Sequence, residues 1–386
     1  MFSGTTVVAA CLTFVLIGAL SSFYGPLIPI FEVRFGIGHG AASALLSAHA
    51  IGAFIGVIGA AQALRWLTNR AFLVATMAIL AIGFIGLALA PSWETVLAGA
   101  GFVGVGFGAL DLGVNQLFAY SFGIRAGTML NILNGVFGIG AVAAPIIVAA
   151  VAPGGIGPMY VGCAVFALAL AVPLSRVRGH GTPTDGKGSS TLGRTGGRGV
   201  AAIVGLFAVA YALYVGVELG VGGWEPTHLT AIGLSAATAS VATSAFWLGL
   251  TAGRFLIAPV ALRVAPEPIV LACSGLAILT LGLAAVPGLA PVAYAATGLV
   301  IAPIYPTGFA WLAKVTPGRR TPTVYLVGSA LGGAAIFPPL IGSAIEGYGT
   351  SVTPLALAML AIGTLLAFAG VALTGRRLRA DPGSFR

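Results

Sequence analysis

The stretch Gly101-Phe-Val-Gly-Val-Gly-Phe-Gly-Ala-Leu-Asp111-Leu-Gly-Val-Asn115-Gln116 is a long apolar run with one carboxylate set inside it. In the hydrocarbon of a bilayer, an acid costs several kcal/mol unless it faces protein or a water-filled cavity, so such acids are rare and usually mark an ion or substrate path. At helical spacing, one stripe of this run carries Gly104, Gly108, Asp111 and Asn115. We expect the stripe to face other helices, and Asp111 is the first candidate functional residue.

The composition excludes a soluble globular protein. Hydrophobic residues make up 58% of the 386 residues and charged residues only 7%, with a mean hydropathy of +1.06. Ordinary soluble domains carry about a quarter charged residues. At about 20 apolar residues per crossing, the chain has room for about twelve helices and none for a soluble domain. We therefore expect the lipid bilayer as a partner. The net charge of +9 does not predict a nucleic-acid partner here, because the basic residues are sorted to one side of the membrane.

Apolar runs and the basic residues between them predict a topology. The runs predict twelve helices, near residues 5–30, 41–64, 71–90, 95–121, 128–151, 158–174, 200–229, 234–260, 269–286, 292–313, 323–345 and 351–373. If odd-numbered helices run outward from the cytoplasm, all 18 Lys and Arg residues except Arg34 fall at or near the inner side. Under the positive-inside rule, this predicts a multi-pass protein of the inner (plasma) membrane with both termini cytoplasmic.

The longest break, residues 175–199, is rich in Gly, Ser, Thr and basic residues and cannot bury enough apolar surface to fold alone. We expect it to be a flexible cytoplasmic linker. It would join an N-terminal six-helix bundle, residues 1–174, to a C-terminal six-helix bundle with a short cytoplasmic tail, residues 200–386.

These two halves repeat each other at an offset of 193 residues, half of the chain length. Repeated six-helix halves are typical of alternating-access transporters. The predicted fold class is therefore an all-α membrane protein with twelve transmembrane helices in two pseudo-symmetric six-helix halves. The residues that match at this offset are Gly56 with Gly249, Arg70 with Arg263, Gly140 with Gly333, and Pro145 with Pro338.

Over essentially its full length, the chain resembles the major facilitator superfamily. The twelve crossings, the basic central loop and the half-chain repeat carry the general resemblance, which implies the major facilitator fold and alternating access. A closer resemblance is to the fucose-permease-like branch, whose members are mostly proton-coupled carriers of sugars. It rests on Tyr214-Val-Gly-Val-Glu218-Leu-Gly-Val-Gly-Gly-Trp224 and on Gly106-Phe-Gly-Ala-Leu-Asp111-Leu-Gly-Val-Asn115.

Asp111 and Glu218 are the candidate proton-coupling residues. A low-dielectric cavity disfavours the charged form of a carboxyl group, so such a group can load and release a proton during a transport cycle. Each acid has a plainer interpretation. Asp111 can be bonded to Asn115 or Gln116 merely to hold helices together, and Glu218 can be a solvated charge in an outer vestibule.

Amides and aromatic rings are the candidate substrate-binding groups, because amides orient hydroxylated solutes and aromatic faces stack on sugar rings. The same amides can instead bond across helices, and the aromatic rings can simply pack. Glycines after Glu218 predict a loosened helix that turns Trp224 toward the cavity. The substrate-binding candidates are Asn115, Asn131, Asn134, Tyr211, Tyr214, Trp224 and Trp247; the candidate gating residues are Arg70, Arg254 and Arg263.

The sequence holds no phosphate-binding Gly-rich Lys motif, no zinc-type His/Cys cluster and no Ser/His/Asp set in polar context, so we expect no enzyme activity, cofactor or metal site. Our main hypothesis is a monomeric secondary active transporter that couples protons to symport of a small polar, sugar-like solute by alternating access; sodium in place of the proton stays open. One alternative is a proton-driven exporter of drugs or metabolites. Another is a non-transporting membrane sensor with the same fold.

Overall fold

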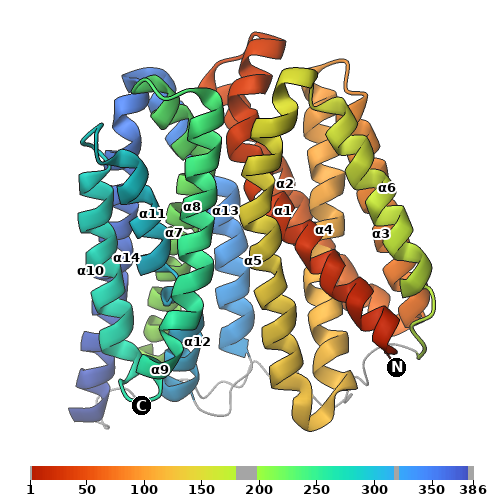
Figure 1. Cartoon of the computed structure of the whole chain (residues 1–386). Coiled ribbons are helices and arrows are strands. Elements are labelled where there is room, and N and C mark those ends of the chain that lie inside the picture. Colours follow the sequence, from red (N-terminus) through yellow and green to blue (C-terminus); the bar gives the residue numbers. More distant parts are fainter. Residues whose placement is uncertain (1, 180–197, 317–320, 381–386) are drawn as a thin grey trace. The chain divides into compact units, whose positions relative to one another are not determined.

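The computed structural model describes residues 2–179, 198–316 and 321–380 (Figure 1). Its elements are helices, and within the described residues twelve spans are long and apolar enough to cross a membrane. The predicted all-α fold class with twelve transmembrane helices is confirmed. The described residues form two compact units: residues 2–179 with 235–244, and residues 198–234 with 245–316 and 321–380.

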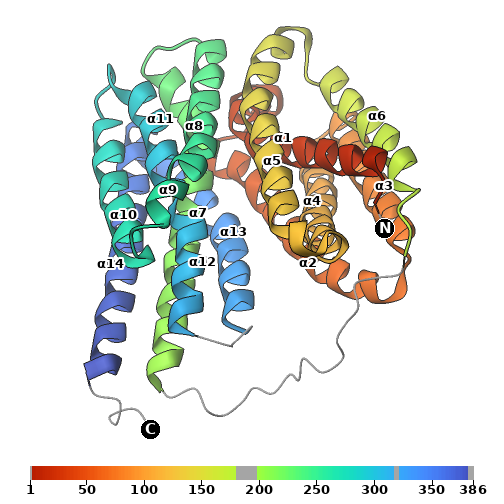
Figure 2. The same ribbon diagram turned by 60° about the horizontal axis from the view of Figure 1, so that its bottom comes forward.

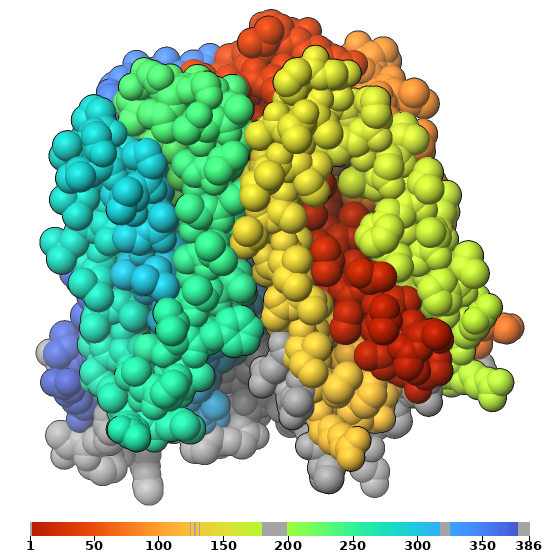
Figure 3. All heavy atoms as spheres, viewed as in Figure 1, coloured from red at the N-terminus to blue at the C-terminus, as the bar shows by residue number. Residues whose placement is uncertain are grey.

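The first unit contains six long helices. On one face, α1 lies between α5 and α6 (Figure 3), while α3 packs beside α6 and α4 (Figure 2). Short 3-10 turns, Gly123–Arg125 and Ala152–Gly154, flank α5. The helices are α1 (Gly4–Phe35), α2 (His39–Trp66), α3 (Asn69–Ala88), α4 (Trp93–Ser121), α5 (Ala126–Val151) and α6 (Gly157–Leu174).

The second unit is built around α7, which packs against α13 and α14. The first residues of α8, up to 244, group with the first unit. A 3-10 turn, Thr350–Val352, precedes the last helix. The helices are α7 (Arg198–Ala231), α8 (Ala236–Leu256), α9 (Ala258–Ala261), α10 (Pro266–Leu283), α11 (Ala290–Ile301), α12 (Ile304–Val315), α13 (Thr321–Tyr348) and α14 (Thr353–Ala380).

The predicted domain division stays a prediction. Of the expected linker 175–199, residues 180–197 lie outside the described residues, as do residues 381–386 of the expected tail. The described part of the linker ends at Gly179, and α7 begins at Arg198.

Glycines let helices α2 and α4 approach backbone to backbone. A Cβ on Gly104 would collide with the His49 carbonyl, and one on Gly108 with the Ala53 carbonyl. Small residues at such positions are what close packing of membrane helices requires. The prediction that the glycines of the α4 stripe face another helix is confirmed.

The repeated glycines make equivalent contacts in the two units. Gly140 on α5 packs on the Val15 carbonyl of α1, and its match Gly333 on α13 packs on the Ala212 carbonyl of α7. Gly56 and Gly249 likewise pack α2 on α4 and α8 on α11. The sequence repeat therefore conserves particular helix contacts within each unit as well as the helix count.

In the second unit, the helix break lies at a different place from the predicted one. We predicted a loosened helix at the glycines after Glu218, but α7 is continuous from Arg198 to Ala231. These glycines serve packing instead: a Cβ on Gly222 would lie 2.8 Å from the Trp247 ring. The break falls at Ala302 and Pro303, where the predicted helix 292–313 divides into α11 and α12, because proline cannot donate a helical hydrogen bond.

Candidate functional site

Asp111 begins a chain of polar side chains that joins α4 to α5. Asn115 Nδ2 donates to Asp111 Oδ1 at 3.2 Å and to the Asp111 carbonyl at 2.8 Å. Asn134 Nδ2 in turn donates to Asn115 Oδ1 at 3.2 Å, across the two helices. These contacts are compatible with both roles considered for Asp111. The hydrogen bonds can hold the helices together, and the half-buried acid also lies among amides that can hydrogen-bond a solute.

The two candidate amide side chains of α5, Asn131 and Asn134, differ in what the structure describes. Asn134 is exposed and bonded to Asn115 and to the Leu130 carbonyl. Asn131 lies in α5, but its side chain is outside the described part of the structure. Only Asn134 therefore contributes to the site as described.

In the second unit, Glu218 of α7 and Arg254 of α8 form an ion pair. Arg254 Nη2 lies 3.7 Å from Glu218 Oε1, and the two side chains are 36% and 14% exposed. Arg254 was predicted as an inner gating residue, and its reach to the middle of α7 was not foreseen. A paired acid and guanidinium at this depth can hold a polar solute between them, since each keeps hydrogen-bonding capacity beyond the pair.

Tyrosines surround this ion pair. Tyr211 and Tyr214 lie at helical spacing on the Glu218 face of α7, and both side chains are buried. The Tyr211 hydroxyl donates to the Tyr305 carbonyl at 2.6 Å, and the Tyr214 and Tyr305 rings are 6.1 Å apart. Gly308 on α12 admits this contact, because a Cβ there would lie 2.5 Å from the Tyr211 hydroxyl.

Tyr305 was not among the predicted site residues. Its proximity depends on the α11–α12 break, which brings the start of α12 against α7. Pro303 and Pro306, on either side of Tyr305, are the sequence signal that could have found this break.

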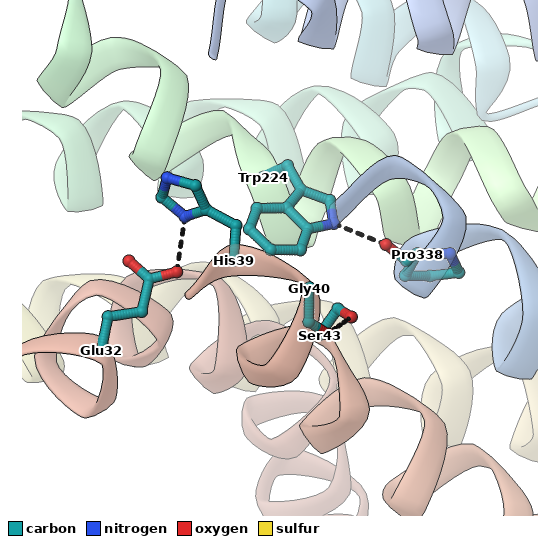
Figure 4. Close-up of polar contacts among 6 residues, drawn as sticks. All are labelled: Glu32, His39, Gly40, Ser43, Trp224 and Pro338. Carbon is teal, nitrogen blue, oxygen red and sulfur yellow. Dashed lines mark hydrogen bonds and ion pairs between the residues drawn. The ribbon is translucent and has the colours of Figure 1, made fainter. Parts of the chain in front are cut away.

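The two predicted tryptophans differ in their surroundings. Trp247 is buried on the same α8 face as Arg254, and among the described residues its Nε1 has no hydrogen-bond partner. Trp224 is fully buried, and its Nε1 donates to the Pro338 carbonyl at 2.9 Å (Figure 4). Since α7 is continuous through these residues, the spacing of six places Trp224 on a different face of α7 from Glu218. Trp247 is thus the better placed of the two for a ligand beside Glu218.

Two clusters of polar side chains near the ends of membrane spans were not among the predicted site residues. Glu32 Oε1 of α1 pairs with His39 Nδ1 of α2 at 2.6 Å (Figure 4). Glu225 of α7 is fully buried, and one turn later His228 shares a 3.0 Å hydrogen bond with Tyr294 of α11. The signal that singled out Asp111, an acid inside an apolar run, applies equally to Glu225.

The other predicted gating residues lie at span ends. Arg70 is in the first turn of α3 and Arg263 follows α9, both exposed. No cluster of three or more His, Cys, Asp or Glu side chains that could hold a metal occurs within the described residues.

Comparison with known proteins gives matches to solved structures alone. No protein-family model and no curated protein sequence matches the chain. A mutant of the nucleoside transporter NupG superimposes with a TM-score of 0.79 at 16% identity, over 95% of this chain and 100% of that chain. A D-xylose-proton symporter gives 0.76 at 14% identity, over 94% and 96%. A bacterial homologue of the human lysosomal transporter Spinster gives 0.74 at 14%, over 99% of each chain.

At these identities the likeness establishes the fold. The chain is a multi-pass membrane protein with the twelve-helix fold of major facilitator transporters. The three neighbours are transporters by name.

Proposed function

We propose that the chain is a secondary active transporter that couples protons to the symport of a small polar solute bearing a sugar-like ring. The fold and its transporter neighbours support the general activity. The motifs around Asp111 and Glu218, which resemble the fucose-permease-like branch, support the finer assignment.

The observation that carries the proposal is the Glu218–Arg254 pair inside its aromatic surroundings. Removing charges from water costs several kcal/mol per ion, so a partly buried pair such as this one contributes little to stability. Ionisable groups within membrane spans instead mark solute and ion paths. A pair that a ligand can enter is consistent with a binding site that opens and closes.

The chemistry of the second unit suits a hydroxylated ring. Glu218 accepts hydrogen bonds from ring hydroxyls, Arg254 donates to ring oxygens, and the Trp247 Nε1 offers a further donor. Tyr214 adds an aromatic face. The D-xylose and nucleoside carried by two structural neighbours both contain such a ring.

Asp111 is our candidate for the proton-binding group, with Asn115 and Asn134 ordering its surroundings. Its side chain is half-buried on α4. Proton loading at Asp111 and solute binding near Glu218 would then be separate events in one cycle.

Reconstituted vesicles test the proposal. Addition of pentoses, hexoses or nucleosides outside protein-containing vesicles should raise the external pH as protons enter with the solute. If cationic drugs instead drive protons in the direction opposite to the drug, the protein is a proton-driven exporter and the symport proposal is wrong. If a solute binds but neither the solute nor protons cross the membrane, the protein is a non-transporting sensor.

A further inference from the structure

An arginine-lined groove lies at one end of the first unit and shares no lining residue with the Asp111 site. Its volume is about 510 Å³, within the range of about 300–1,000 Å³ that is typical of small-molecule sites. The lining comes from the start of α3, at Thr68 and Arg70, and from residues 175–179, which follow α6. Helices α3 and α6 pack side by side in this unit (Figure 1).

Asn69 holds the two walls of the groove together. Its backbone N–H donates to the Gly179 carbonyl at 3.0 Å, and its Nδ2 donates to the Arg178 carbonyl at 3.3 Å. Asn69 and Val177 are both buried, whereas Arg176 and Arg178, on either side of Val177, are exposed. Burial of Val177 and the bonds to Asn69 therefore hold these two arginines beside Arg70.

The groove concentrates positive charge, and no acidic side chain of the described residues lines it. None of Arg70, Arg176 and Arg178 forms an ion pair within the described part of the chain. Like charges held in one groove repel one another unless an anion lies between them. Guanidinium groups bind phosphate oxygens through two parallel hydrogen bonds, so a phosphate is the anion that this donor set fits best.

Neighbouring side chains indicate the depth of the groove. Trp66, at the end of α2 and two residues before Thr68, is 83% exposed, and exposed tryptophans gather at the membrane–water boundary. Val172, in the last turn of α6, is 61% exposed and presents apolar surface next to the groove. The arginines thus lie at headgroup level beside a surface that suits acyl chains.

We propose that this groove binds the phosphate of an anionic phospholipid headgroup. Zwitterionic phosphatidylcholine carries the same phosphate beside a quaternary ammonium cation, which the three arginines repel. Phosphatidylglycerol presents the phosphate without that cation. The groove should therefore distinguish the two lipids by charge, and increasing ionic strength should weaken the preference.

Native mass spectrometry of the purified full-length protein tests the site. The protein is titrated with phosphatidylglycerol, with phosphatidylcholine and with inorganic phosphate, and bound adducts are counted. The wild type should retain phosphatidylglycerol in preference to phosphatidylcholine. R176Q/R178Q should weaken that binding at least about tenfold, since two charge-assisted contacts are lost.

The control is R125Q/K314Q, which removes two exposed positive charges from other span ends and should bind phosphatidylglycerol like the wild type. Both variants are first compared with the wild type by thermal unfolding, so that misfolding is recognised. Equal phosphatidylglycerol binding by R176Q/R178Q and the wild type would overturn the site. Displacement of phosphatidylglycerol by inorganic phosphate at equal concentration would overturn the lipid assignment in favour of a soluble phosphate.

Discussion

Asp111 accepts a hydrogen bond from Asn115, and an asparagine in its place keeps that acceptor but cannot carry a proton. Asp111→Asn should therefore abolish proton-driven accumulation of the solute, while exchange of solute down its own gradient survives at least in part. Accumulation and counterflow in the same vesicle preparation measure the two activities.

Asn115→Ala is the matched control for Asp111→Asn. It removes the bonds to Asp111 and to Asn134 yet leaves the acid in place. Accumulation by this variant should still require the proton gradient. If Asp111→Asn accumulates solute like the wild type, Asp111 holds helices together and the proton is bound elsewhere, with Glu225 as the next buried acid to examine.

Glu218→Gln removes the charge that pairs with Arg254. Loss of one charged hydrogen bond to a ligand should raise the apparent solute constant at least about tenfold. Glu267→Gln is the control, because it breaks the peripheral Arg376–Glu267 pair, whose atoms are 2.9 Å apart. Solute affinity unchanged in Glu218→Gln on correctly inserted protein would return Glu218 to the role of a vestibule charge.

Single residues could be predicted where composition makes them conspicuous. Asp111 and Glu218 stand out in apolar runs, and both lie among polar or aromatic partners. The approach of Arg254 to Glu218 could not be predicted, because it depends on the packing of α7 against α8. Glu225 was overlooked although the same physical argument applies to it.

At the scale of helices, the repeated glycines predict a measurable loss of stability. A Cβ on Gly333 would collide with the Ala212 backbone, so Gly333→Ala should destabilise the second unit by about 1–3 kcal/mol and lower its unfolding temperature. Gly328 lies on the same helix with nothing within 4 Å of its Cβ position. Gly328→Ala should therefore leave the unfolding temperature unchanged or raise it. Equal effects of the two substitutions would show that this contact between α7 and α13 is not tight.

Helix count and approximate bounds followed from apolar periodicity, but the place of the helix break did not. Three closely spaced glycines, Gly220, Gly222 and Gly223, suggested flexibility in α7, whereas they allow close packing, as with Gly222 on Trp247. Glycine permits both outcomes, and the neighbouring helix decides between them. Proline also permits both outcomes, since Pro226 lies inside the continuous helix α7, whereas Pro303 lies at the break between α11 and α12.

For the whole molecule, composition and the repeat offset were sufficient to predict a twelve-helix membrane protein, because hydrocarbon forces each crossing to be a helix of similar length. Composition and the repeat offset do not predict which substrate the protein binds. In the proposed site, specificity would depend on a few side chains such as Glu218, Arg254 and Tyr305, whose juxtaposition arises from packing within the second unit.

Membrane orientation is a prediction for the whole chain, carried by the placement of all Lys and Arg residues except Arg34 on one side. Gly188→Cys, in the expected linker and outside the described residues, should resist a membrane-impermeant thiol reagent in intact cells and react once the cells are permeabilised. Pro91→Cys, in the exposed turn between α3 and α4, is the matched control and should react in intact cells. The native Cys11, Cys163 and Cys273 are replaced by serine beforehand. Ready labelling at position 188 together with protection at position 91 would invert the orientation of every helix, and the arginine groove would then lie at the outer surface.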